Sequence, residues 1–269
     1  MVLAVKFIKL FFTLFSENRI TQASAALSYY LTMTFFPLLI ITYSFLGESY
    51  ARTEQLLELA EWLLSEELIA FIHDFFLYVD SGDRSIMLPV GLSVLLAYAS
   101  SGLRCVQSTI GSIQGGAEHK GLGAFLFSFV YCLALLALVY FAVILMLSGP
   151  ELIERIIGFF PYSTKIAELI PIPYILLTLI LFLFLLGLYH VPKRRQDKYR
   201  VLPGATVASI AVLLMSPIFS FVINSSIKYS LVYGAIASVI LLMLWIYMCC
   251  VLIYSGAILN VTLYAVKNK

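Results

Sequence analysis

The chain has 269 residues, of which 62% are hydrophobic and 12% are charged, and its formal net charge is +2. A soluble domain carries about 25% charged residues, so this chain lacks the polar side chains that would cover a globular surface. A net charge this small argues against nucleic acid as a partner, because binding phosphates takes many basic side chains. The composition therefore predicts a membrane protein.

Apolar runs long enough to cross a membrane as a helix, about 20 residues each, occur six times. None of them contains Asp, Glu, Lys, Arg or His, although the chain has 17 basic and 15 acidic residues. Lipid selects this segregation, since a charge at mid-bilayer costs roughly 2.5–3.5 kcal/mol. We therefore predict an all-α, polytopic membrane protein with six transmembrane helices in a single domain, residues 1–269. The six runs are Ala25–Gly47, Ile86–Leu103, Leu122–Leu147, Ile172–Tyr189, Val201–Val222 and Tyr233–Leu259.

The basic residues between these runs fall mostly on one side of the predicted membrane. Because cytoplasmic loops carry the excess of Lys and Arg, the richer side is predicted to be cytoplasmic. With six spans, both termini are then cytoplasmic. The richer side holds Lys6, Lys9, Arg19, Arg104, Lys120, Lys193, Arg194, Arg195, Lys198, Arg200, Lys267 and Lys269. The other side holds Arg52, Arg84, Arg155, Lys165 and Lys228.

Two segments outside the runs have helical periodicity. In residues 1–20, polar side chains from Lys6 to Glu17 share one arc of a helical wheel, and Leu3, Phe7, Leu10, Phe11 and Leu14 share the opposite arc. This pattern predicts an amphipathic helix at the cytoplasmic interface. A signal peptide is disfavoured because Arg19 interrupts the short apolar stretch. Residues 53–79 alternate acidic and apolar positions at helical spacing, which predicts amphipathic helices on the extracytoplasmic side.

Side chains that carry catalysis or hold metals are scarce. The three histidines lie in three different loops, and the sequence has no HExxH motif, no P-loop and no Gly-rich dinucleotide turn. The four cysteines lie in or next to apolar runs, where packing explains them. Cys249 and Cys250 would point about 100° apart on a helix, too far to share a metal. We therefore expect no enzyme activity, no metal and no cofactor.

Several spans combine hydroxyl and aromatic side chains with a proline that removes a helical hydrogen bond, as Pro37 and Pro217 do. Buried hydroxyls need partners, so they are expected to face one another or a water-filled cavity. Two interpretations stay open: hydrogen bonds between helices, or a polar cavity among the first, second, fifth and sixth spans. The candidate substrate or cavity residues are Tyr29, Tyr30, Thr32, Pro37, Ser100, Ser101, Arg104, Tyr233, Trp245, Tyr247 and Asn260.

A basic run precedes the fifth span, with Asp197 as its acidic member. Membrane topology alone would select such a run, but it is also a candidate for binding anionic lipid head groups, at about 1 kcal/mol per basic residue. Arg104 is a candidate to hold a phosphate at the mouth of the cavity. The head-group candidates are Lys193, Arg194, Arg195, Lys198 and Arg200.

Short motifs along the chain resemble the YihY/BrkB family of bacterial inner-membrane proteins, formerly mislabelled as ribonuclease BN. They are Ala25-Ala26-Leu27-Ser28-Tyr29-Tyr30, Phe35-Phe36-Pro37-Leu38-Leu39, Ala99-Ser100-Ser101-Gly102-Leu103-Arg104, Val191-Pro192, Leu202-Pro203-Gly204-Ala205, Tyr233-Gly234-Ala235-Ile236, Leu244-Trp245-Ile246-Tyr247, Gly256-Ala257 and Leu259-Asn260. The resemblance implies six transmembrane helices with cytoplasmic termini in the bacterial cytoplasmic membrane. Two departures are visible: Ile258 stands where the family usually has Glu, and a Gly-rich stretch at 108–120 replaces the family's usual Asn-containing segment and Glu-x-Arg.

Together these observations favour a transporter or flippase-like protein for an amphipathic, anionic, lipid-related substrate. The alternative is a non-transporting accessory or scaffold protein of the cell envelope. A membrane nuclease is disfavoured, because the sequence offers that chemistry no metal ligands. Membrane lipids are the expected partners and nucleic acid is not, while a homo-oligomer or an envelope protein partner stays open.

Overall fold

Every element of regular secondary structure in the described part of the chain is an α-helix, as predicted. The computed structural model describes residues 2–46, 66–80, 82, 84–115, 172–190, 201–224 and 235–267. The predicted run 122–147 and the segment 53–65 lie outside these residues. The helices are α1 (Val2–Glu17), α2 (Ile20–Leu46), α4 (Glu66–Asp80), α5 (Arg84–Ile113), α8 (Ile172–His190), α9 (Leu202–Asn224) and α11 (Ala235–Lys267).

Four of these helices are long and apolar enough to cross a membrane: α2, α5, α9 and α11, through the segments Ile20–Ile41, Ile86–Ile113, Leu202–Phe219 and Val239–Lys267. In α8 a shorter apolar stretch, Thr178–His190, follows the same pattern. Five of the six predicted runs thus coincide with helices, whereas the number of spans and their orientation remain predictions.

Three of the observed helices extend beyond the spans predicted for them. We expected the first span to begin at Ala25, the second to end at Leu103 and the last to end at Leu259, but α2 begins at Ile20, α5 continues to Ile113 and α11 to Lys267. Each predicted span ends where the hydrophobicity of the sequence falls. Helices persist beyond that point because neighbouring helices stabilise them by packing.

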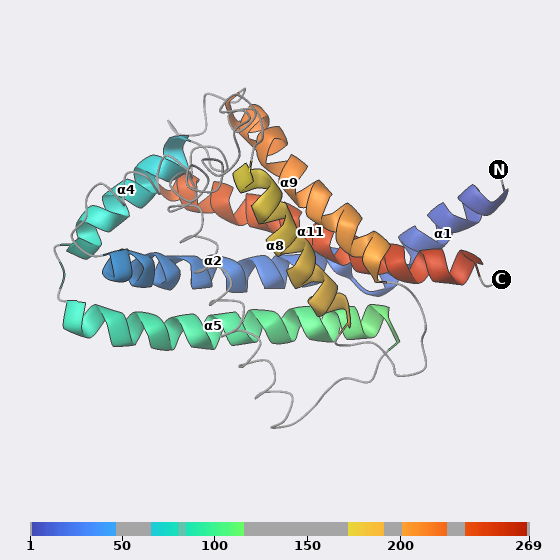
Figure 1. Cartoon of the computed structure of the whole chain (residues 1–269), viewed down its shortest axis with the longest axis horizontal. Helices are drawn as coiled ribbons and strands as arrows, with labels where there is room; N and C mark the ends of the chain where they lie inside the picture. Colours follow the sequence, from blue (N-terminus) through green and yellow to red (C-terminus); the bar gives the residue numbers. More distant parts are fainter. Residues whose placement is uncertain are drawn as a thin grey trace, which may run out of the picture.

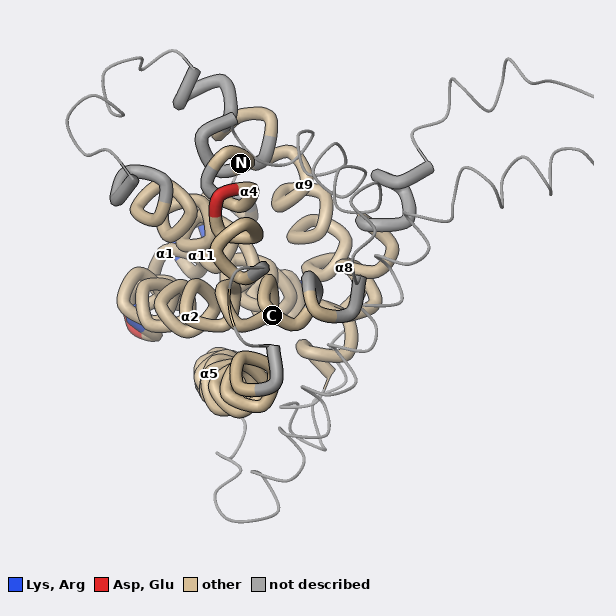
Figure 2. Tube along the Cα trace, turned by 90° about the vertical axis from the view of Figure 1, so that its left-hand side faces the viewer, with Lys and Arg blue, Asp and Glu red and all other residues tan. Residues whose placement is uncertain are grey.

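α2 and α5 lie side by side along the long axis of the molecule, and α11 and α9 run obliquely to them (Figure 1). α2 packs against α5 and α11, and α9 packs against α11 and α8. Both termini lie at one end of this bundle, which we call the termini end, and α4 lies at the other, the α4 end (Figure 1). Seen along the bundle, α5 and α9 occupy opposite edges, and few charged residues lie along the tube (Figure 2).

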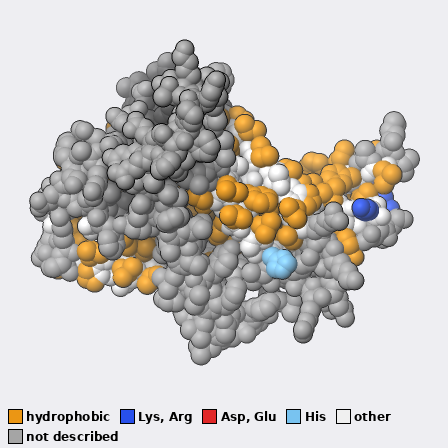
Figure 3. Space-filling view, viewed as in Figure 1, with side chains coloured by type: hydrophobic (Ala, Val, Ile, Leu, Met, Phe, Trp, Pro, Cys, Tyr) orange, Lys and Arg blue, Asp and Glu red, His pale blue; other side chains and the backbone are white. Residues whose placement is uncertain are grey.

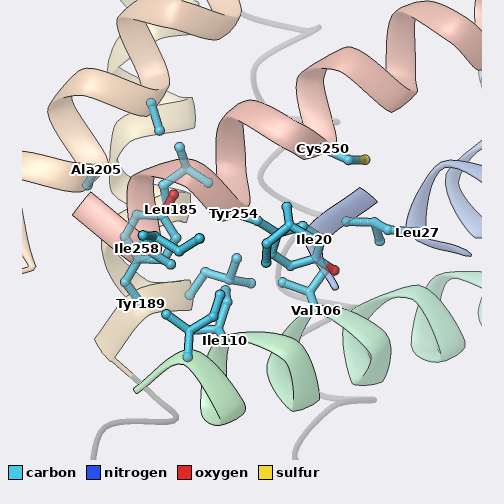
Figure 4. Packing of buried hydrophobic residues seen from close by; sticks show 14 of the residues in the cluster. Ile20, Leu27, Val106, Ile110, Leu185, Tyr189, Ala205, Cys250, Tyr254 and Ile258 are labelled. Atoms are coloured by element: carbon cyan, nitrogen blue, oxygen red, sulfur yellow. The ribbon is translucent and has the colours of Figure 1, made fainter. Parts of the chain in front are cut away.

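The core at the termini end is a cluster of side chains from α2, α5, α8, α9 and α11 (Figure 4). Glycines of α5 let this helix approach α2 closely. A Cβ placed on Gly102 would lie 3.2 Å from Cβ of Tyr30, and one on Gly91 would lie 3.5 Å from Cγ2 of Ile40. Small residues at such positions are typical of helix contacts in membranes. The labelled members are Ile20, Leu27, Val106, Ile110, Leu185, Tyr189, Ala205, Cys250, Tyr254 and Ile258.

The two segments outside the predicted runs are helical where the structure describes them. On α1, Phe11, Leu14 and Phe15 pack against the core cluster, so part of the apolar arc predicted for the membrane interface meets protein instead. α4 buries Ile72, Phe76 and Val79 and packs against α2 and α11. The apolar faces of both helices therefore help to hold the bundle together.

Candidate functional site

One side of α5 is polar toward the termini end. Side chains three or four residues apart share a helix face, and Ser93, Ala97, Ser101, Arg104, Ser108 and Ser112 follow that spacing; we call this set the α5 polar face. Ser101 is half-buried and the others are exposed. The opposite side of the same helix, with Leu95, Leu103, Val106 and Ile110, is buried in the core.

Arg104 lies well before the end of α5. It stands nine residues before Ile113, which places it about 13.5 Å from that end of the helix at a rise of 1.5 Å per residue. The Nη2 of Arg104 donates a hydrogen bond to Oγ of Ser101, 3.1 Å away. We predicted a span that ends just before Arg104, but the membrane-length segment Ile86–Ile113 includes this residue. The helix therefore continues past Arg104, and the guanidinium group lies on an exposed position inside this candidate segment.

Two tyrosines join the α5 polar face to α2. Tyr29 is 43% exposed, and its ring centroid lies 6.3 Å from that of Tyr98 on α5 and 5.7 Å from that of Tyr30. The exposed positions of α2 nearer the termini end are small or polar as well: Thr21, Gln22, Ala25 and Ala26. The polar surface thus extends over two neighbouring helices.

Most hydroxyl groups of these spans bond to their own helix. Thr32 Oγ1 donates to the carbonyl of Ser28 at 2.8 Å, Ser101 Oγ donates to that of Ala97 at 2.8 Å, and Ser100 Oγ donates to that of Leu96. We expected partners on other helices or in a cavity. A Ser or Thr hydroxyl reaches the carbonyl one turn back within a helix, so its hydrogen bond demands neither.

The candidate residue Asn260 lies where α9 and α11 cross in close contact. The side chain of Asn260 is 1% exposed. Its Oδ1 accepts a hydrogen bond from the backbone N–H of Gly204 at 2.7 Å, and its Nδ2 donates to the carbonyl of Val201 at 3.1 Å. The first N–H groups of a helix have no partner within it. Asn260 of α11 therefore caps the start of α9.

Two glycines make this crossing possible. A Cβ on Gly204 would overlap the carbonyl oxygen of Gly256 and would lie 2.5 Å from Nδ2 of Asn260. A Cβ on Gly256 would lie 2.6 Å from the hydroxyl of Tyr189 and 2.8 Å from Cβ of Ala208. The motif residues Gly204, Gly256 and Asn260, far apart in sequence, thus meet at one place.

Tyr189 and Gln114 attach α8 to the same place, and the sequence analysis missed both. The hydroxyl of Tyr189 donates to the carbonyl of Ile253 at 2.5 Å, and Nε2 of Gln114 donates to the carbonyl of Tyr189 at 2.9 Å. The signal available was a tyrosine at the last position of an apolar run. Its partner, a backbone carbonyl on another helix, leaves no trace in the sequence.

The remaining candidate residues belong neither to the α5 polar face nor to the α9–α11 crossing. Pro37 is buried within α2, which continues past it. Trp245 and Tyr247 are half-buried on α11, and the indole N–H of Trp245 has no hydrogen-bond partner among the described residues. Within that same part of the chain, no three His, Cys, Asp or Glu side chains come together as metal ligands would. Tyr233, Lys193, Arg194, Arg195, Lys198 and Arg200 lie outside the described residues.

Comparisons with known proteins agree with the motifs. Residues 11–269 match the model of the family described as Virulence factor BrkB. The ribonuclease-like protein YfkH of Bacillus subtilis (strain 168) is 24% identical over 268 residues, covering 98% of this chain and 97% of YfkH. A UPF0761 membrane protein of Histophilus somni (strain 129Pt) is 24% identical over 278 residues, covering 97% of this chain and 91% of the relative. No solved structure matches.

Proposed function

Because this chain belongs to the Virulence factor BrkB family of membrane proteins, we propose that it binds an anionic, lipid-related amphiphile and moves it across the bacterial cytoplasmic membrane. The observation that carries this proposal is the α5 polar face, with an exposed arginine inside a helix of membrane-spanning length. Intramembrane ionisable residues are rare and usually mark a pathway for a polar substrate.

The free-energy cost of placing the charged side chain of Arg104 in a membrane supports this function. Insertion scales put the cost of an Arg at the centre of a membrane helix at roughly 2.5–3.5 kcal/mol. An arginine that only filled space on the outside of α5 would be replaced by an apolar residue at no loss. A guanidinium that binds phosphate in its water-depleted surroundings offsets that cost, because charge-assisted hydrogen bonds are strong there.

Reconstitution tests the proposal. The purified protein is placed in liposomes that contain a head-group-labelled phosphatidylglycerol, and the transfer of label between leaflets is followed with an impermeant quencher. We expect saturable transfer above that of protein-free liposomes. The Arg104→Gln variant should lower it about fivefold, the equivalent of ~1 kcal/mol for one basic residue near an anionic head group. Neither transfer nor saturable binding of any anionic lipid would contradict the proposal.

A scaffold function has one observation in its favour. On α4, Leu77 and Tyr78 are 53% and 66% exposed and lie beside the exposed Asp74. An exposed apolar patch at the α4 end suits an envelope protein partner. Crosslinking in cells separates the two functions: a scaffold gives one dominant protein partner through α4 and tolerates Ser101→Leu on α5, whereas a transporter loses lipid transfer in that variant.

A further inference from the structure

The exposed apolar surface ends at different levels on the two edges of the bundle. On α9, large apolar side chains are exposed from the first residue onward: Leu202, Val207, Ile210, Leu214 and Ile218. On α5, the exposed large apolar residues are Ile86, Val90 and Leu92, and the α5 polar face follows them. Apart from Thr206, the exposed side of α9 is therefore apolar up to the start of the helix, whereas the exposed side of α5 becomes polar before the helix ends.

The contacts at the termini end show that these two helix ends lie at one level. Gln114, directly after α5, bonds to the carbonyl of Tyr189. The hydroxyl of Tyr189 lies where a Cβ on Gly256 would be only 2.6 Å from it, and Gly256 touches Gly204 at the start of α9. A flat membrane that covers Leu202 and Val207 of α9 therefore also covers Arg104 on α5.

Lipid accommodates such a difference at modest cost by changing its own thickness. Mismatch costs fractions of a kcal/mol per Å, and head groups and water move toward a charged residue through local thinning. Keeping Arg104 in undisturbed hydrocarbon costs more. The polar head groups therefore descend along the α5 polar face, from Ser112 toward the Arg104–Ser101 pair.

We infer that the bilayer is locally thinned beside α2 and α5, and that Arg104, oriented by its hydrogen bond to Ser101, binds the phosphate of an anionic phospholipid there. The inference rests on the proposed function for its ligand class. Its charge is complementary, since α2 and α5 together contain no Asp or Glu between residues 20–46 and 84–113. The exposed hydroxyl of Ser108 adds a hydrogen-bonding group along the path, and the acyl chains stay in the adjoining lipid.

Photocrosslinking of the intact protein in lipid nanodiscs tests this inference. One phosphatidylglycerol probe carries the reactive group on its head group, and a second carries it at the acyl chain end; labelled peptides are mapped by mass spectrometry. We expect the head-group probe to label residues 93–112 and the acyl probe to label residues 206–218 of α9. Equal labelling of both segments by the head-group probe, or no label on 93–112, would overturn the inference.

Variants and competitors identify the ligand. Arg104→Gln should lower head-group labelling of residues 93–112 about fivefold, whereas Arg104→Lys, which keeps the charge, should retain most of it. Lys6→Gln removes one charge from an exposed position of α1 and should leave the labelling of residues 93–112 unchanged. A phosphatidylcholine probe should label less than phosphatidylglycerol, and excess inorganic phosphate should not compete. Equal labelling by both lipids, or loss of labelling with inorganic phosphate, contradicts an anionic lipid as the ligand.

The same samples separate this inference from the proposed function. If residues 93–112 are labelled but no lipid crosses the membrane in liposomes, the head-group site stands and transport fails. If lipid crosses while this segment stays unlabelled, transport stands and the site fails. Arg104→Lys serves both measurements as the folded, charged reference.

Discussion

The start of α9 and the second half of α5 lie at the same end of the bundle, but the first buries its polar groups and the second exposes them. At the start of α9, the polar backbone groups are buried and matched by Asn260, and the outside is apolar. On α5, the inside is apolar and the polar groups point outward. Figure 3 shows the apolar surface of the first region, with Lys and Arg confined to the termini end of the visible described face. The comparison shows that the buried polar groups at the start of α9 stabilise the fold, whereas the exposed polar groups of α5 are available to bind a ligand.

The largest effect is expected from filling the α9–α11 crossing. Gly204→Ala places a Cβ against the backbone carbonyl of Gly256, which does not move without separating the helices. Overpacking of this kind costs about 1–3 kcal/mol or more, and the separated helices also lose the Asn260 cap. We expect the free energy of unfolding, followed by thermal denaturation in detergent, to fall by about 3 kcal/mol. The neighbour Thr206→Ala, on the exposed side of α9, is the control; equal stability of the two variants would refute the close crossing.

A somewhat smaller loss is expected for Asn260→Ala. This change leaves the N–H of Gly204 buried without a partner, at about 1–3 kcal/mol for an unsatisfied group, whereas the carbonyl of Val201 keeps the hydrogen bond that it accepts from the N–H of Ala205. Thr262→Val is the matched control, because the Thr262 hydroxyl bonds to the carbonyl of Ile258 within its own helix. Denaturation should show a loss of ~2 kcal/mol for the first and little change for the second. Similar losses would mean that Asn260 caps nothing.

Tyr189→Phe should cost less again. The change removes the hydroxyl that donates to Ile253 but keeps the ring in the core. One hydrogen bond contributes about 0.5–1.5 kcal/mol net, so the melting temperature should fall by only a few degrees. Amide hydrogen exchange is the sharper measurement, since α8 should exchange faster while α2 keeps its protection. Unchanged exchange in α8 would show that this bond does not hold the helix.

The sequence predicts the fold better than the site, for a physical reason. Hydrophobicity alone locates helices such as α9 and α11, because lipid excludes charge from any segment that it surrounds. The same reasoning ends the second span before Arg104 and does not predict that helix packing continues α5 beyond the apolar run. Asn260 was predicted as a substrate or cavity residue, and the structure shows it hydrogen-bonded to the backbone of α9. Its two backbone partners on α9 and the partners of Tyr189 depend on tertiary contacts that composition does not encode.

The smallest effect on stability, and the sharpest test of the comparison, is expected from exchanging the character of the two surfaces. Ser101→Leu gives α5 an apolar outside like that of α9, and Val207→Ser gives α9 a hydroxyl like those of α5. Both side chains lie at the outside of the bundle, so each change should alter the free energy of unfolding by no more than about 0.5 kcal/mol. Head-group labelling and lipid transfer should nevertheless fall in Ser101→Leu, because the change removes the hydroxyl that accepts a hydrogen bond from Arg104. Val207→Ser should leave both unchanged, because α9 contains no Lys or Arg that the added hydroxyl could orient toward a phosphate. If Ser101→Leu transfers lipid normally, the α5 polar face is not the path, however well the protein folds.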